Sequence, residues 1–250
     1  RAHEKAGRQI SSINSVMMLA SGITPAIGGI IATGVGIGWT YAAGIAFLLA
    51  ASVPFWRAPD VVEPETATVR ELNLRRIWKD PVANGFNGMT TGAEIIVWPL
   101  IIYFVVESYA AVGILSSIIL IASVGVSLYV GRREEQRGER HYLKQGLGLE
   151  SLTNVLRAVV QNAFHVFGVN LIGGVGRSLY LTPYMTRYYR NADGPHRISY
   201  IAAMETAHEA GFAAILSGLY LLSLALAPEQ ALLWTALLAA PASFGTRLIR

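Results

Sequence analysis

The sequence predicts an all-helical protein of the polytopic membrane class, a bundle of about eight transmembrane helices. Hydrophobic residues make up 53% of the 250 residues and charged residues 14%, whereas charged residues make up roughly 25% of a typical soluble domain. The segment Ala110–Val130 contains 21 residues without a charge, close to the ~20 that a helix needs to cross a bilayer. The charges gather in polar segments, above all in Gly131–Lys144, GRREEQRGERHYLK.

Eight apolar segments, separated by glycine, proline and charged residues, are the predicted spans. In chain order they are approximately Ser12–Gly34, Trp39–Trp56, Gly85–Val106, Ala110–Val130, Gly146–Gln161, Ala163–Thr186, Ile198–Leu226 and Ala231–Thr246. The polar stretch Arg57–Asp80 interrupts them after the second span. Its prolines favour a linker, and its second half has the composition of a short amphipathic helix on the membrane surface.

The fifth span decides the topology, because it is short and contains Glu150, Asn154 and Arg157. If it crosses, 18 of the 20 Lys and Arg residues lie on one face of the membrane. If it does not cross, the last two basic clusters move to the opposite face. The positive-inside rule therefore favours a crossing, with the basic face in the cytoplasm and the protein in the cell membrane.

Composition limits the chemistry. The chain has no cysteine, which excludes zinc–thiolate sites, iron–sulfur clusters and disulfides, and we expect no cofactor. The net charge of +4 and the pI near 9.4 follow from the positive-inside bias, so nucleic acid is not an expected partner. Since the chain begins RAHEKAGR, without Met, we expect it to be a fragment.

Two local patterns resemble motifs of a known family. The segment Ala20–Gly29, ASGITPAIGG, is similar to GxxxGPxxGG: Pro25, Gly28 and Gly29 match, and two glycine positions hold alanine and threonine. Gly22 and Gly29 also belong to a row of small residues on which another helix can approach closely. This is the fifth-helix pattern of the major facilitator superfamily of secondary transporters.

The charged segment is similar to the cytoplasmic loop pattern GxLaDRxGRR of the same family. Gly131, Gly138 and Arg140 match, Glu135 stands for the aspartate, and two basic positions hold glutamine and glutamate. These departures put the loop's gating interactions in doubt. Simple helix packing for the first motif and a solvated loop for the second remain alternatives to a gating role.

The resemblance covers nearly the whole chain and implies a domain organisation. Residues 1–56 resemble the last two helices of the amino-terminal six-helix half, 57–80 the central cytoplasmic linker, and 81–250 the carboxy-terminal half. The spans would then be helices five to twelve of twelve. The family surrounds a central site near the membrane midplane with two such halves.

Ionisable residues at membrane depth are costly, so each one is a functional candidate. Glu94 lies in the middle of the third span and Arg177 near the middle of the sixth. Glu205, His208 and Glu209 lie at i, i+3 and i+4 of the seventh span, so they share one helix face. By resemblance, the third and sixth spans line the cavity, which favours Glu94 and Arg177.

Arg177 and the pair Glu205/Glu209 lie on consecutive antiparallel spans, and we expect an ion pair between them. This pair would either hold two helices in register or take part in solute binding or a proton relay, with His208 titrating near neutral pH. Asn154, His165 and Asn170 are assigned to packing or the membrane interface.

Enzyme hypotheses find little support. Glu205-Thr206-Ala207-His208 matches half of a di-iron bundle site, but the chain has no second Glu-x-x-His. The sequence also lacks HExxH, GxSxG and GxxxxGK[ST]. The predicted function is therefore non-enzymatic: a membrane transporter that moves a small solute by alternating access, as symporter or antiporter, with a proton or sodium ion. An intramembrane enzyme and a non-transporting membrane scaffold are the alternatives.

The topology predicts that Arg190 faces the cytoplasm. The natural sequence has no cysteine, so Arg190→Cys creates a single reactive thiol. We expect an impermeant maleimide to label it in inside-out vesicles and to leave it unmodified in intact cells. Labelling from outside intact cells would contradict the topology and the crossing of the fifth span.

Overall fold

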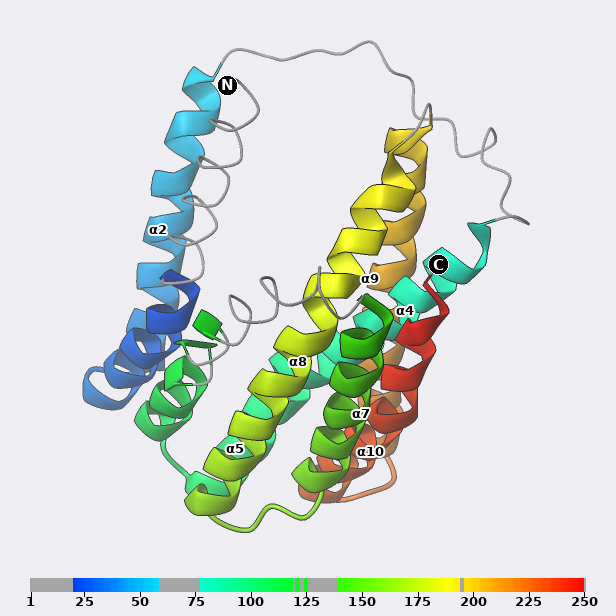
Figure 1. Ribbon diagram of the computed structural model, residues 1–250. Helices are drawn as coiled ribbons and strands as arrows, with labels where there is room; N and C mark the ends of the chain where they lie inside the picture. Colours follow the sequence, from blue (N-terminus) through cyan, green and yellow to red (C-terminus); the bar gives the residue numbers. More distant parts are fainter. Residues whose placement is uncertain are drawn as a thin grey trace.

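The computed structural model describes residues 20–58, 77–118, 120–121, 124–125, 139–193 and 196–249 (Figure 1). Within these ranges the regular structure is helical and no strand occurs. The predicted all-α class is therefore confirmed. The division into two halves joined by a linker stays a prediction.

The described helices follow the predicted spans in order. They are Ala20–Gly34, α2 (Ile37–Arg57), α4 (Lys79–Gly92), the π-helical turn η2 (Ala93–Val97), α5 (Trp98–Val106), Tyr109–Ile118, α7 (Glu139–Arg157), α8 (Ala163–Ala192), α9 (Arg197–Ser223), α10 (Pro228–Gly245) and the 3₁₀ turn η3 (Thr246–Leu248). Because α4, η2 and α5 are contiguous, they form one helix interrupted by a π turn.

Several helices extend past the apolar segments that predicted them. The third span begins at Lys79 instead of Gly85, α7 begins inside the charged segment at Glu139, and α8 continues beyond Thr186 to Ala192. Hydropathy marks the part of a helix that avoids water, whereas the backbone hydrogen bonds continue into polar residues. The rest of the charged segment, with Gly131, Glu135 and Gly138, and most of the linker lie outside the described residues.

Two helices of the described chain, Ile37–Arg57 and Lys79–Val106, are long and apolar enough to cross a membrane. The helices α8, α9 and α10 contain many Gly, Ala, Ser and Thr residues together with charges. Small residues lower the mean hydropathy and allow helices to approach closely. That these three helices and the others cross the bilayer stays a prediction.

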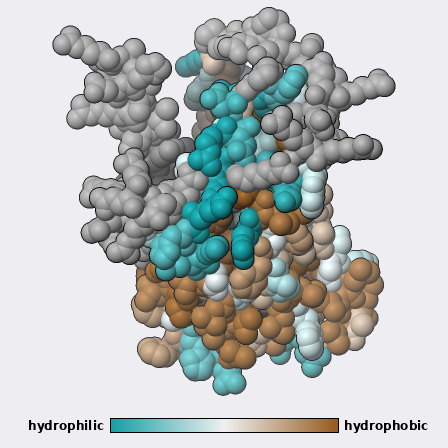
Figure 2. Space-filling model, turned by 45° about the vertical axis from the view of Figure 1, so that its right-hand side comes forward, coloured by the Kyte–Doolittle hydropathy of each residue, from teal (hydrophilic) through white to brown (hydrophobic). Residues whose placement is uncertain are grey.

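The surface carries a belt of apolar side chains. Figure 2 shows brown, hydrophobic residues around one part of the molecule, with hydrophilic residues above and below it. Helix α2 is the extreme case: none of its 21 residues is buried, and Phe47 and Phe55 are 77% and 79% exposed. An apolar helix with no buried face is unfavourable in water. The described chain leaves this surface uncovered.

Close backbone contacts hold the carboxy-terminal bundle together. Helix α4 packs along α9, α7 along α8, and α10 against α4, α7 and α9. A Cβ atom on Gly88 of α4 would overlap the backbone oxygen of His208, and one on Gly211 of α9 would overlap that of Gly85. Only glycine allows this approach. It places the polar residues of α4 directly beside those of α9.

The helix Ala20–Gly34 reaches the rest of the protein through the helix Tyr109–Ile118. A Cβ atom on Gly29 would overlap the backbone oxygen of Tyr109, and one on Gly113 would overlap that of Pro25. Helix α2 folds back beside Ala20–Gly34 after a turn at Gly36, whose φ of 107° suits glycine. The first motif is thus a helix-packing surface in this structure.

The α4–α9 contact predicts the effect of one methyl group. Gly88→Ala should destabilise the protein by about 1–3 kcal/mol or more, because overpacking forces two backbones apart. Thermal unfolding of the purified protein in detergent measures the change. Gly218→Ala is the control, since nothing lies within 4 Å of a Cβ atom there. An unchanged Tm for Gly88→Ala would contradict the close contact.

Candidate functional site

One face of the helix Lys79–Val106 carries a polar side chain at every turn. These side chains recur at the three- and four-residue intervals that define one helix face. They are Asp80, Asn84, Asn87, Thr90 and Glu94. All except Glu94 are buried. Buried polar groups need hydrogen-bond partners, and α8 supplies most of them.

Helix α8 faces this stripe in the antiparallel direction with long polar side chains. Tyr180 Oη donates to Asn87 Oδ1 over 3.4 Å, and Tyr184 Oη donates to Asn84 Oδ1 over 2.6 Å. At the end of the stripe, the Asn191 amide donates to Asp80 Oδ2 over 3.4 Å. Residue numbers rise along α4 as they fall along α8, as expected for antiparallel helices. We call this set of contacts, together with the pair described next, the α4–α8 polar seam.

Glu94 and Arg177 form an ion pair at the far end of the seam. Their side chains are 25% and 26% exposed, so neither is fully hydrated. Glu94 lies in the π-helical turn η2, and π turns often mark functional sites because they redirect side chains. The structure therefore joins the two residues that the sequence favoured as cavity residues.

The predicted pairing of Arg177 with Glu205 or Glu209 is wrong in this structure. Since α8 continues to Ala192, Arg177 lies 15 residues from its end, or about 22 Å at 1.5 Å per residue. Glu205 lies only eight residues from the start of α9, or about 12 Å. The two residues are at different depths, and Glu205 instead accepts a hydrogen bond of 2.9 Å from Tyr188 Oη.

The three predicted site residues on α9 do not form one cluster. His208 Nδ1 lies 3.3 Å from Glu209 Oε1, and the Glu209 side chain is 73% exposed. Within the described residues, no group of three His, Asp or Glu side chains could hold a metal ion. A di-iron site around Glu205 and His208 therefore receives no support from the described residues.

The sequence analysis missed a second buried polar cluster. Arg157 and Glu150 on α7 are only 4% and 1% exposed. Arg157 donates to Asn154 Oδ1 over 2.7 Å, and its guanidinium carbon lies 5.2 Å from the centre of the Trp98 ring. Trp98 Nε1 in turn donates to Asn170 Oδ1 over 2.5 Å. The sequence signal for this cluster was the presence of Glu150 and Arg157 in one short span. It was interpreted only as an argument against a membrane crossing there.

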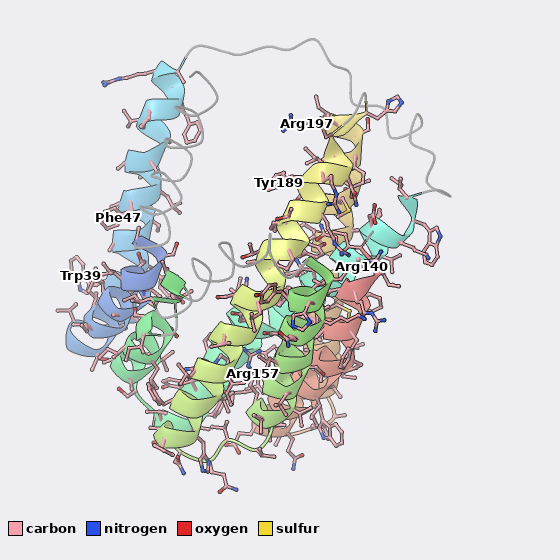
Figure 3. All side chains as sticks on the ribbon, in the orientation of Figure 1. Trp39, Phe47, Arg140, Arg157, Tyr189 and Arg197 are labelled. Atoms are coloured by element: carbon pink, nitrogen blue, oxygen red, sulfur yellow. The ribbon has the colours of Figure 1, made fainter. Side chains whose placement is uncertain are left out.

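Figure 3 shows where the two ends of the bundle lie. Arg157 is in the lower part of the view, whereas Arg197 and Tyr189 are nearer the upper end. Arg140, which matched the loop motif, is exposed near the start of α7 and lies between these two levels. The predicted membrane topology stays a prediction.

Two of the hollows along the helix Lys79–Val106 contain candidate site residues. The first, the Glu94 cavity, has a volume of about 480 Å³ and is mostly apolar, and Glu94 is its one charged lining residue among those described. Pro25, Gly28 and Trp98 also line it. It lies between the first two helices and the carboxy-terminal bundle.

The second hollow, the Asn87 pocket, has a volume of about 310 Å³ and lies between α4, α8 and α9. Its lining residues are mostly polar. They are Asn84, Asn87, Met185, Tyr188, Tyr189, Ile201, Glu205 and His208. Glu209 lines neither hollow.

Comparison of the chain with family models, with curated protein sequences and with solved structures finds no match. The resemblance to the major facilitator superfamily remains a hypothesis from the sequence. The function is therefore argued from the geometry of the site.

The ion pair predicts coupling between Glu94 and Arg177. Arg177→Met should destabilise the protein by about 1–3 kcal/mol, less than the ~3–5 kcal/mol of a fully buried pair, because water reaches both groups. The charge swap Glu94→Arg with Arg177→Glu should recover more than half of the loss in thermal unfolding. The exposed Glu229→Gln serves as a neutral control. Independent, additive effects of the two single substitutions would contradict the pairing.

Proposed function

We propose that this protein is a membrane transporter of the major facilitator type, which moves a small solute by alternating access and uses a proton or sodium gradient. The observation that carries the proposal is the Glu94–Arg177 ion pair. It lies within the helix bundle. Glu94 lines one cavity, and the Asn87 pocket lies further along the same helix. Charges at such depth are usually retained for binding or ion movement.

The surface supports a location in the membrane. Helix α2 and the helix Lys79–Val106 are long and apolar enough to span a bilayer, and α2 buries no residue against the rest of the chain. The apolar belt in Figure 2 lies between hydrophilic surfaces, as lipid-facing surfaces do. In this proposal, lipid and neighbouring helices cover the exposed side chains of α2.

The ion pair can act as a switch. When Glu94 carries a negative charge, it attracts Arg177 and holds α4 to α8. A proton on the carboxylate, or a sodium ion beside it, weakens this attraction, and the change is moderate in size because water reaches part of both side chains. A conformation in which Arg177 binds a different partner is then favoured. This difference in binding between two states is what coupling requires.

The helix contacts suit a rocking movement. The first two helices touch the rest of the described chain at the small residues Pro25, Gly29 and Gly113, and the Glu94 cavity lies along this boundary. The contact is made by backbone at Gly29 and Gly113 and by short side chains, with Ser117 Oγ accepting from Ala26 N and Thr33 Oγ1 accepting from Ala110 N. One group of helices can tilt against the other there, opening the cavity to either side in turn.

Transport is tested with the full-length protein in liposomes, with candidate solutes and imposed pH or sodium gradients. We expect gradient-dependent flux, and Glu94→Gln should reduce the gradient dependence at least about tenfold, since it removes the group that exchanges the ion. Glu229→Gln, at an exposed helix end, should leave flux unchanged. Chemical conversion of a solute without net flux would defeat the proposal.

A further inference from the structure

The Asn87 pocket differs in chemistry from the Glu94 cavity. Six of its eight lining residues are polar, and its volume of about 310 Å³ is at the lower end of the range for small-molecule sites. Glu205 is its one carboxylate, and no Lys or Arg lines it. The pocket therefore combines a mostly apolar wall with one carboxylate and several hydrogen-bonding groups, in a space for something about the size of a monosaccharide.

The hydrogen bonds within the pocket leave two groups available. The amide of Asn84 is occupied on both sides, by Tyr184 and by the backbone oxygen of Met204. Asn87 is 95% buried, accepts from Tyr180 and has no described acceptor for its own Nδ2. Glu205 Oε1 accepts from Tyr188, which leaves Oε2 without a described partner. One donor and one anionic acceptor thus face the pocket.

We propose that the Asn87 pocket binds a small hydrophilic solute that carries an ammonium group. The ammonium group binds Glu205, and an oxygen of the solute accepts from Asn87. An ammonium group complements this lining, because the exposed Glu205 is its one carboxylate and neither Lys nor Arg lines the pocket. An anionic solute would meet this carboxylate at close range and be repelled.

The surrounding helices hold these groups in place. Backbone contact at Gly88 and His208 fixes α4 against α9, and the Tyr188 hydroxyl orients the Glu205 carboxylate. Groups held in this way lose little freedom on binding, which favours affinity. His208, 19% exposed and next to Glu209, adds a polar wall.

The pocket and the ion pair are separate sites on one helix. Asn87 and Glu94 are seven residues apart, or about 10 Å along the axis. The inference that the pocket is a solute site rests on the proposed transport function, but binding to the pocket can be measured without transport.

Binding is measured by thermal unfolding and by isothermal titration with the full-length protein in detergent, below the pKa of each amine. Two matched pairs serve as probes: glucosamine against glucose, and 1,5-diaminopentane against 1,5-pentanediol. We expect the ammonium member of at least one pair to bind and its neutral counterpart to bind at least tenfold more weakly. Glu205→Gln should weaken that binding about 10- to 100-fold, the usual effect of losing a charged hydrogen bond.

The charge-matched comparison is Glu209→Gln, one turn along α9 and outside the pocket. It should retain the wild-type affinity. Failure of both amines to bind, equal binding of the neutral probes, or equal losses in the two variants would overturn the inference. Binding of an amine without flux in liposomes would refute the transport function but support the binding site. Flux of solutes without any binding of the amines would support the transport function but refute the binding site.

Discussion

Glu94 and Arg177 are charged groups in a bundle that is otherwise largely apolar, and the arrangement of α4 and α8 depends on their attraction. Each charge alone would lose much of its hydration at that depth, whereas the pair replaces part of it. The other contacts of the polar seam follow from the same requirement. Tyr180 and Tyr184 reach buried amides on α4 because those amides have no water to bind. Removing the pair would leave the seam to the hydrogen bonds of Tyr180 and Tyr184 with the α4 amides.

Close helix contact is the second constraint. Gly88 and Gly211 let the backbones of α4 and α9 touch, and such close approach adds van der Waals attraction along the two helices. The same contact brings Asn87 beside His208 and creates the polar pocket. Packing and site are thus consequences of the same small residues.

The cluster around Arg157 shows how a buried charge is tolerated away from the seam. Arg157 has Asn154 as acceptor and the Trp98 ring beside its guanidinium group, so it keeps partial compensation for lost water. This cluster links α7 to α5, whereas the Glu94–Arg177 pair links η2 to α8. The two sites stabilise different parts of the same bundle.

The sequence alone determined the helical class and the order of the helices, because apolar length can be recognised without coordinates. It also made Glu94 and Arg177 candidates, because ionisable residues in apolar segments can be recognised in the same way. Only the tertiary structure decided which carboxylate Arg177 meets. The predicted span ended at Thr186, whereas α8 continues to Ala192, so the depth of Arg177 relative to Glu205 was misjudged. The partner of Arg177 is Glu94, which is far away in sequence. The Asn87 pocket was equally inaccessible to sequence reasoning. Its residues come from three helices, and the contact that assembles them depends on which glycines face each other, which local patterns do not specify.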